Sequence, residues 1–343
     1  FNDIKRTDKQ MGVFGEVSYA LSDTSELSVG ARWYDIEVDF EGSANSSFYN
    51  GFGNPDTQQF GSNLSAQYAP GNANGYPDKA ATDGVIGKVT YSWYQSEDTM
   101  LYVTMSEGFR PGLLNRPVGS SSPDGTYTVK PSIESDEITN YEFGWKAVLK
   151  DGALRFNGSV FMVDVSGLQS TIFDPSIVNL FFSDNAADAE IKGVEGDILY
   201  YTDSGLILSG AFSILNTEIT KSLVPTADVV VGSHLAFAPG FQANFSARKE
   251  WGTSMGNTGH WQAQFNHSRA SDSDIMEPNR ATQASYFLAN IRAGVSNDSW
   301  TAEMYIDNVF DERAEISNTF VFDRQRVAVI RPLNVGFRYK VKF

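Results

Sequence analysis

The sequence predicts an all-β fold, a transmembrane antiparallel β-barrel to which this chain contributes about thirteen strands. Three observations predict it. The strand-like segments reach about ten to fifteen residues and alternate apolar with polar side chains, and a tilted membrane strand needs roughly nine to eleven residues to cross the hydrocarbon. Their connections alternate between short turns and long polar loops. The chain also ends on an aromatic residue inside such a strand, where a soluble domain usually frays.

The composition narrows the classes of function. The chain has 343 residues, of which 41% are hydrophobic, with no cysteine and a formal net charge of −16. No run of about eighteen apolar residues exists, so no transmembrane helix is expected. The acidic balance argues against a nucleic-acid partner, which would require a basic face. The chain opens without an initiator methionine or a signal peptide, and we interpret it as the C-terminal part of a longer exported protein.

Each predicted strand is marked by its alternation and by the turn residues that bound it. In chain order the predicted strands are residues 11–21, 27–40, 85–94, 100–109, 138–149, 154–165, 189–201, 206–220, 241–251, 260–268, 281–295, 300–307 and 326–343. Tight turns such as 150–152 (KDG), 203–205 (DSG) and 296–299 (SNDS) join successive strands into hairpins. The connection at 252–259 is the longest of these short turns.

The long connections are predicted to lie together on the other side of the membrane. We expect one domain, residues 1–343, with long extracellular loops at about 41–84, 111–132, 174–183, 221–233, 269–279 and 312–325. If the last strand ends in the periplasm, counting back places every short turn in the periplasm and every long loop outside, as in outer-membrane barrels.

The faces of the strands alternate as a wall between lipid and water requires. In the last strand, LNVGFRYKVKF, Val335 and Phe337 share a face with Tyr339 and Val341, and Arg338 lies on the other face. A soluble β-sandwich also alternates, but it does not normally need strands of this length. Aromatic residues near strand ends are candidates for interfacial girdles, namely Trp33, Tyr34, Trp93, Trp251 and Trp300.

The same strand resembles the C-terminal signal by which the barrel-assembly machinery recognises outer-membrane barrels. The residues that carry this resemblance are Asn334, Gly336, Tyr339, Val341 and Phe343. The alternative interpretation of this strand alone is the edge strand of a soluble sandwich.

Several segments together resemble TonB-dependent outer-membrane receptors. They are residues 107–117 (EGFRPGLLNRP), 134–152 (ESDEITNYEFGWKAVLKDG), 185–196 (NAADAEIKGVEG) and 308–311 (NVFD), joined by the terminal strand. The resemblance implies a barrel of about 22 strands with a plugged lumen, located in the bacterial outer membrane. This chain would hold about the last thirteen strands, and the plug, the TonB-contacting segment (the TonB box) and the first strands would be absent.

The resemblance also implies a function and partners. The family takes up scarce ligands, with ferric siderophores the commonest cargo, and TonB supplies the work that releases a tightly bound ligand. Carbohydrate, cobalamin or another organic nutrient are alternative cargoes, and a passive porin-like channel or a structural surface barrel are alternative functions. The expected partners are TonB, the barrel-assembly machinery, lipopolysaccharide and membrane lipid, and a small-molecule ligand, with a surface lipoprotein as a further candidate.

Arg110, Asn115 and Arg116 lie where a predicted strand meets an extracellular loop. Arginine side chains bind carboxylates, phosphates or catecholates through two parallel hydrogen bonds, so these residues are candidate ligand contacts. The alternative, which we favour, is that they fix the loop or the plug through hydrogen bonds. No histidine occurs near this segment, which disfavours haem as the ligand.

The long loop at about 41–84 is rich in aromatic residues. Rings on an external loop can grip a siderophore or stack on a sugar, and they can equally pack the loop onto itself. The candidate ligand contacts in this loop are Tyr49, Phe52, Tyr68 and Tyr76.

The remaining chemistry-bearing residues do not indicate a metal site, a resident cofactor or an enzyme. His234, His260 and His267 are scattered, and the last two are predicted to face opposite sides of one strand. The acidic cluster at 271–274 with Glu277 lacks the spacing of a calcium loop. The arginines near the last loop, Arg324, Arg326 and Arg331, could contact lipopolysaccharide or ligand. No nucleophile elbow or glycine-rich phosphate loop occurs.

Overall fold

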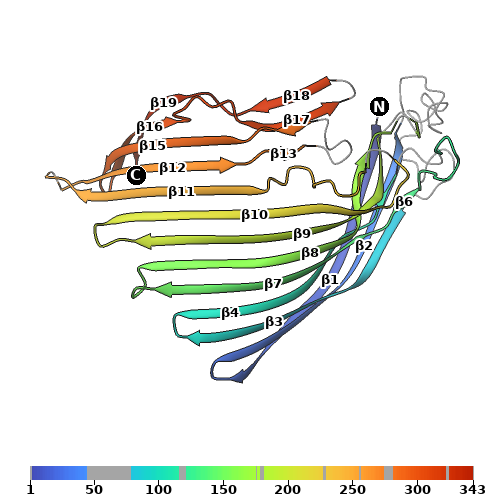
Figure 1. Ribbon diagram of the computed structural model, residues 1–343, viewed down its shortest axis with the longest axis horizontal. Helices are drawn as coiled ribbons and strands as arrows, with labels where there is room; N and C mark the ends of the chain where they lie inside the picture. The colour runs from blue at the N-terminus through green and yellow to red at the C-terminus, as the bar shows by residue number, and fades with distance from the viewer. Residues whose placement is uncertain are drawn as a thin grey trace.

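The computed structural model describes residues 2–44, 79–115, 121–174, 176–177, 181–226, 229–254, 256–273, 281–321 and 324–342. Within these residues one curved antiparallel sheet of thirteen strands accounts for most of the chain, as predicted (Figure 1). Each strand pairs with the next one along the sheet. No helix of the described part is long and apolar enough to cross a membrane.

The main sheet follows chain order, and three small hairpins lie in the connections. The strands of the main sheet are β1 (Asn2–Ser22), β2 (Ser25–Ala44), β3 (Lys79–Ser96), β4 (Thr99–Arg110), β7 (Asp136–Leu149), β8 (Leu154–Ile172), β9 (Phe182–Tyr201), β10 (Leu206–Ser222), β11 (Phe241–Gly252), β12 (Thr258–Ser268), β15 (Tyr286–Ser296), β16 (Trp300–Asp307) and β19 (Asn334–Val341). The small hairpins are β5 (Leu113–Leu114) with β6 (Ser132–Ile133), β13 (Ser271–Asp272) with β14 (Thr282–Gln283), and β17 (Glu315–Val321) with β18 (Arg324–Val329).

The short turns gather at one end of the sheet and the long connections at the other (Figure 1). The last strand, β19, ends on the short-turn side, so the alternation of turns and loops predicted from the sequence holds along the whole described sheet. If β19 ends in the periplasm, the short turns are periplasmic and the long connections extracellular, as in outer-membrane barrels. The connection predicted at about 41–84 is shorter than expected, because β2 runs to Ala44 and β3 begins at Lys79.

Several strands continue beyond their predicted ends on the extracellular side. β8 extends to Ile172 and β9 begins at Phe182, whereas the sequence pattern placed these ends at Val165 and Ala189. The pairing of β8 with β9 shifts register between Val165 and Leu168, as it does at a β-bulge. The bulge breaks the alternation by which the strand was recognised, although the backbone hydrogen bonding continues beyond it.

The last predicted strand, 326–343, is wrong as a single element. The structure divides it into β18 and β19, with residues 330–333 between them. Pro332 lies in this interval, and proline cannot donate a hydrogen bond to a sheet. β18 pairs with β17, so a hairpin rises from the predicted loop at 312–325.

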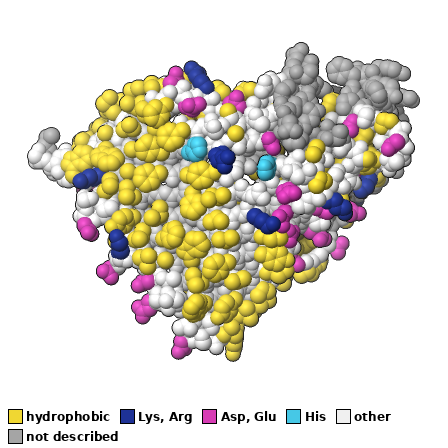
Figure 2. Space-filling view, in the orientation of Figure 1, with side chains coloured by type: hydrophobic (Ala, Val, Ile, Leu, Met, Phe, Trp, Pro, Cys, Tyr) yellow, Lys and Arg dark blue, Asp and Glu magenta, His cyan; other side chains and the backbone are white. Residues whose placement is uncertain are grey.

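The two faces of the sheet differ as the lipid–water interpretation requires. On β19, Phe337 is 65% exposed and shares the outward face with Val335 and Tyr339, whereas Arg338 faces inward. Arg338 contacts Glu303 at 3.6 Å and lies over the ring of Tyr305. Figure 2 shows the outer face, where hydrophobic side chains form a broad band across the sheet.

Most of the predicted girdle residues are exposed, but Tyr34 is not. Trp33, Trp93 and Trp251 each expose more than a third of their surface. Tyr34 is only 7% exposed and stacks on Phe109 with ring centroids 3.7 Å apart. The neighbouring positions of a strand point to opposite faces, which is why Trp33 and Tyr34 could not both face lipid.

Candidate functional site

A packed cluster of apolar side chains lies at the extracellular end of β8, β9 and β10, and we call it the cap core. It combines strand residues with residues of three connections, those following β4, β8 and β10. Its buried members are Val129, Ile172, Ile177, Phe182, Ala186, Ala187, Ile219, Val224 and Val229, with Tyr127 and Leu235 packed against them. These connections are therefore held in fixed positions by burial, as a small domain would be.

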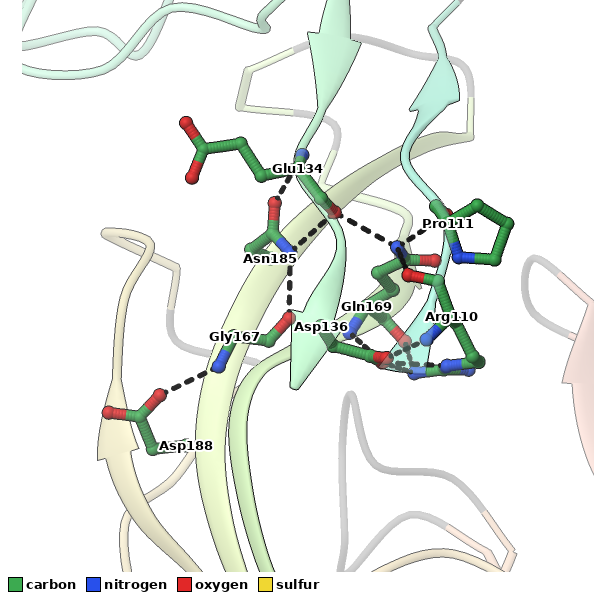
Figure 3. Close-up of polar contacts among 8 residues, drawn as sticks. All are labelled: Arg110, Pro111, Glu134, Asp136, Gly167, Gln169, Asn185 and Asp188. Carbon is green, nitrogen blue, oxygen red and sulfur yellow. Dashed lines mark hydrogen bonds and ion pairs between the residues drawn. The ribbon is translucent and has the colours of Figure 1, made fainter. Parts of the chain in front are cut away.

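A buried carboxylate fixes the strand end from which the first of these connections leaves (Figure 3). Asp136, at the start of β7, is fully buried and forms an ion pair with Arg110 at the end of β4. Its oxygens accept hydrogen bonds from the Arg110 backbone N–H at 2.8 Å and from the Arg110 Nε at 2.6 Å. The Arg110 Nη2 also donates to the carbonyl of Gln169 at 3.1 Å. The guanidinium is thus oriented from two sides while the side chain stays 50% exposed.

Two amide side chains join the neighbouring segments to this pair (Figure 3). The Gln169 Nε2 donates to the carbonyls of Pro111 and Glu134, each at 2.9 Å. The Asn185 side chain accepts from the Glu134 N–H at 2.9 Å and donates to the carbonyls of Glu134 at 3.0 Å and Gly167 at 2.7 Å. Primary amides both donate and accept, so they can satisfy irregular backbone where a sheet ladder has ended.

Gly167 occupies the bulge of β8 and requires glycine-like backbone geometry. Its φ of +66° lies in the left-handed region, and its N–H donates to Asp188 at 2.9 Å. An added Cβ would also approach Asn185. The bulge lies directly before Gln169, whose carbonyl and side chain belong to the network that holds Arg110.

Asn115 is buried and binds the backbone on both sides. Its Nδ2 donates to the carbonyls of Lys130 at 3.0 Å and Ser183 at 2.7 Å, and its Oδ1 accepts from the Ser183 N–H at 2.8 Å. These contacts join the connection after β4 to the start of β9. For Arg110 and Asn115, the contacts within the protein are those of loop anchors, and a ligand contact by either residue stays a proposal.

A second buried carboxylate, Asp184, also lies beside an exposed cation. Asp184 is 1% exposed and accepts a hydrogen bond from the Tyr127 hydroxyl at 2.5 Å. Lys130 lies 3.7 Å from the same carboxylate and is 56% exposed. Burial raises the pKa of the Tyr127 phenol well above its usual range, and the hydrogen bond to Asp184 raises it further by a smaller amount. Arg110 and Lys130 are therefore exposed cations, each oriented by a carboxylate that is itself out of water.

The other residues predicted for the site cannot be placed. Arg116, Tyr49, Phe52, Tyr68 and Tyr76 lie outside the described residues, as does Phe343 of the assembly signal.

Sequence reasoning also missed the residues that organise the site, namely Asp136, Gln169, Asp184 and Asn185. A signal for two of them existed, since Asp136 and Asn185 fall inside segments that resemble the receptor family.

The inner face of the sheet carries a continuous series of polar contacts. Examples are the hydroxyl pair Thr90–Thr104 at 2.9 Å and the His260 Nε2–Glu303 contact at 3.2 Å. His260 is buried on this face, whereas His267 lies among aromatic rings on the other, as their spacing predicted. No cluster of three or more metal-ligating side chains occurs within the described residues. A polar wall of this kind surrounds an aqueous or protein-filled lumen.

Long tilted strands with an apolar outer face, a polar inner face, short turns at one end and packed loops at the other define an outer-membrane β-barrel protein. The chain belongs to the TonB-dependent receptors: the family described as "TonB dependent receptor-like, beta-barrel" matches residues 1–309. Membership places the chain in the bacterial outer membrane, because the family is one of outer-membrane β-barrels. No curated protein matches the sequence significantly.

Solved structures of three other proteins share the fold of the chain at low sequence identity. The ferric yersiniabactin uptake receptor FyuA from Yersinia pestis matches with a TM-score of 0.74 and 16% identity, over 99% of this chain and 46% of FyuA. The siderophore receptor PiuA from Acinetobacter baumannii matches with a TM-score of 0.70 and 16% identity, over 98% of this chain and 44% of PiuA. The copper transporter OprC matches with a TM-score of 0.67 and 14% identity, over 98% of this chain and 48% of OprC. The chain thus spans about half the length of these receptors.

Proposed function

We propose that this chain is part of a receptor that imports a ferric siderophore across the outer membrane with energy delivered by TonB. The observation that carries the proposal is the pair of exposed cations, Arg110 and Lys130, held on buried carboxylates beside the cap core. An oriented guanidinium binds catecholate, carboxylate or phosphate oxygens with both charge and geometry. Fixed positions reduce the entropy that ligand binding would otherwise cost.

Energised transport follows from the physical problem that such a receptor solves. A scarce ligand requires a high-affinity site, and tight binding by itself would trap the ligand. The outer membrane holds no ATP, so the work of release must be delivered by a partner in the inner membrane. In this proposal TonB is that partner, and it acts through a part of the receptor outside this chain.

The site is proposed to extend beyond the two cations. Asn115 and Arg116 lie on the connection that starts at Arg110, and the aromatic residues of the long loop, Tyr49, Phe52, Tyr68 and Tyr76, would close over an iron chelate. Lipopolysaccharide and membrane lipid would surround the wall, and the barrel-assembly machinery would recognise the C-terminal strand. A surface lipoprotein is a further candidate partner.

The similar structures support this cargo without deciding it. FyuA is described as a ferric yersiniabactin uptake receptor and PiuA as a siderophore receptor, whereas OprC is described as a copper transporter. A shared fold at such identities leaves cargo to the loops. Carbohydrate, cobalamin or another organic nutrient remain alternative ligands, and a passive porin-like channel or a structural barrel remain alternative functions.

Binding measurements with purified receptor would test the proposal. Intrinsic fluorescence would be titrated with ferric siderophores of several chemical types, with cobalamin and with oligosaccharides. We expect saturation by one ferric siderophore, with binding about twofold to fivefold weaker in Lys130→Gln, because one exposed charge contact is lost. Lys150→Gln, in the periplasmic turn, is the matched control and should bind as the wild type does.

Each other outcome has a defined meaning. Saturation by cobalamin or an oligosaccharide would replace the cargo and keep the receptor function. No saturation by any compound would favour the porin-like or structural alternative.

A further inference from the structure

Six aromatic rings form a continuous cluster on the outer face of the sheet, and we call it the aromatic ladder. Ring centroids of neighbouring members lie 5.8 to 6.5 Å apart across β11, β12, β15 and the turn after β16. Its members are Phe241, Phe245, Phe265, His267, Phe287 and Phe310. Such spacings are those of stacked and tilted aromatic pairs.

The end of the aromatic ladder that holds Phe241 and His267 fits the extracellular edge of the hydrocarbon. Phe241 and Trp251 lie on the same outward face at the two ends of β11. Ten residues of strand at about 3.3 Å each, tilted by roughly 40°, rise about 25 Å, which is the height of the apolar band of an outer-membrane barrel. With Trp251 at the periplasmic interface, Phe241 and its aromatic neighbours therefore lie at the level where acyl chains meet lipid headgroups.

A cavity of about 470 Å³ opens next to this level, between the connections that follow β10 and β12. Arg269 and His234 line it together with Asp272, its one acidic lining residue. His234 is oriented by a 2.7 Å hydrogen bond between its Nδ1 and the Thr217 carbonyl. Arg269 follows the last residue of β12, on the same side of the chain as His267 of the aromatic ladder.

Arg269 has the properties of an anion-binding group. Its side chain is exposed and has no hydrogen-bond or ion-pair partner among the described residues. Figure 2 shows histidine and basic side chains on the outer face, at the edge of the hydrophobic band nearest the long connections.

The outer face of β8 and β9 at the same end is different. There Lys192 is paired with Glu190 at 2.6 Å, beside Asp164 and Glu218, so its charge is neutralised.

We infer that the cavity and the aromatic ladder together bind a phosphorylated lipid of the outer leaflet. The acyl chains would lie on the aromatic rings, and a headgroup phosphate would enter the cavity to meet Arg269, whose guanidinium suits phosphate geometry. Lipopolysaccharide is the phosphorylated lipid expected around this barrel. The inference depends on the outer-membrane location of the chain and not on which cargo the receptor carries.

The test uses receptor purified from outer membranes in mild detergent. Native mass spectrometry would count the phosphorylated lipid retained by the wild type, Arg269→Gln and Lys249→Gln. Lys249 is the matched control, because it lies on the outward face of β11 near the periplasmic end. We expect retention to fall about tenfold in Arg269→Gln, through loss of one charge-assisted contact, and to be unchanged in Lys249→Gln. Phe287→Ala, which removes a central ring of the ladder, should lower retention without changing any charge.

Three results would overturn the inference. Arg269→Gln could retain as much lipid as the wild type, or both charge variants could lose lipid equally, which would show nonspecific attraction. In a second measurement, inorganic phosphate and vesicles containing the phosphorylated lipid would be compared for protection of Arg269 against a guanidinium-modifying reagent. Equal protection by phosphate alone would identify a free-anion site in place of a lipid site.

Discussion

Replacing Asp136 with alanine should loosen the connection after β4 while leaving the barrel wall intact. Asp136 is fully buried and accepts hydrogen bonds from the backbone and side chain of Arg110 and, at 3.4 Å, from the Gln169 N–H. Removing one partner of a buried ion pair costs about 3–5 kcal/mol. Because Arg110 is half exposed and its guanidinium would be rehydrated, we reduce the expected cost to about 2–3 kcal/mol.

Hydrogen exchange of backbone amides measures this cost where it arises. A loss of about 2–3 kcal/mol corresponds to roughly 30- to 150-fold faster exchange through local opening. The increase is expected across residues 110–135 and at Gln169, whereas amides of β11 and β12 should exchange as before. Asp136→Asn keeps one acceptor oxygen and should give an intermediate increase.

A matched control and a clear refutation are available for this prediction. Asp203→Ala changes the same residue type in the exposed periplasmic turn between β9 and β10, and it should leave exchange of residues 110–135 unchanged. Exchange in Asp136→Ala within about threefold of the wild type would show that the connection is held by the cap core alone, and our account of the Arg110–Asp136 pair would be wrong.

The remaining predictions concern three other positions. Asn308 has a φ of 55°, and its side chain makes three hydrogen bonds, to the Glu312 carbonyl, the Glu312 N–H and the Arg331 carbonyl. Asn308→Ala should therefore cost about 2–4 kcal/mol of local stability. Hydrogen exchange of the backbone amides of residues 309–333 would measure this cost. Asn308→Gly should cost about 1 kcal/mol less, because glycine accepts this φ. Gly336→Ala would place a methyl group against the ring of Tyr305 and should lower the yield of heat-modifiable folded barrel, whereas adding Tyr305→Ala should restore it. The pKa of Tyr127 is raised in the folded protein, so its neutral phenol stabilises the cap core. This contribution is complete below about pH 10 and is lost as the pH rises further. The ultraviolet difference spectrum between the wild type and Tyr127→Phe should therefore show no tyrosinate absorbance near pH 10. Tyrosinate absorbance at that pH would contradict the buried hydrogen bond.

The membrane-spanning part of the fold was predictable because lipid and water impose a two-residue alternation that a single sequence displays. The thirteen strands of the main sheet, the alternation of short turns with long connections and the outward face of β19 all follow from it. Beyond the membrane this constraint ends. β8 and β9 continue past a bulge at Val165–Leu168 with no alternation to reveal them.

The candidate site was predictable only in part, because its contacts join residues that are far apart in the chain. Arg110 was identified from its residue type and position, but its partner Asp136 is 26 residues away, and nothing local distinguishes a buried carboxylate from a solvated one. The cap core likewise unites Val129, Ile172 and Val229, which belong to separate connections and strands. Periodicity describes one segment at a time and therefore cannot reveal such contacts.

Energised uptake of iron is the central claim, and accumulation of radioactive iron tests it most directly. Cells that present the complete receptor would be supplied with a radiolabelled ferric siderophore, with TonB present or deleted. We predict accumulation only with TonB, while binding at the cell surface persists without it. Equal accumulation in both strains would show passive passage, and the receptor would then be a channel and not a TonB-dependent transporter.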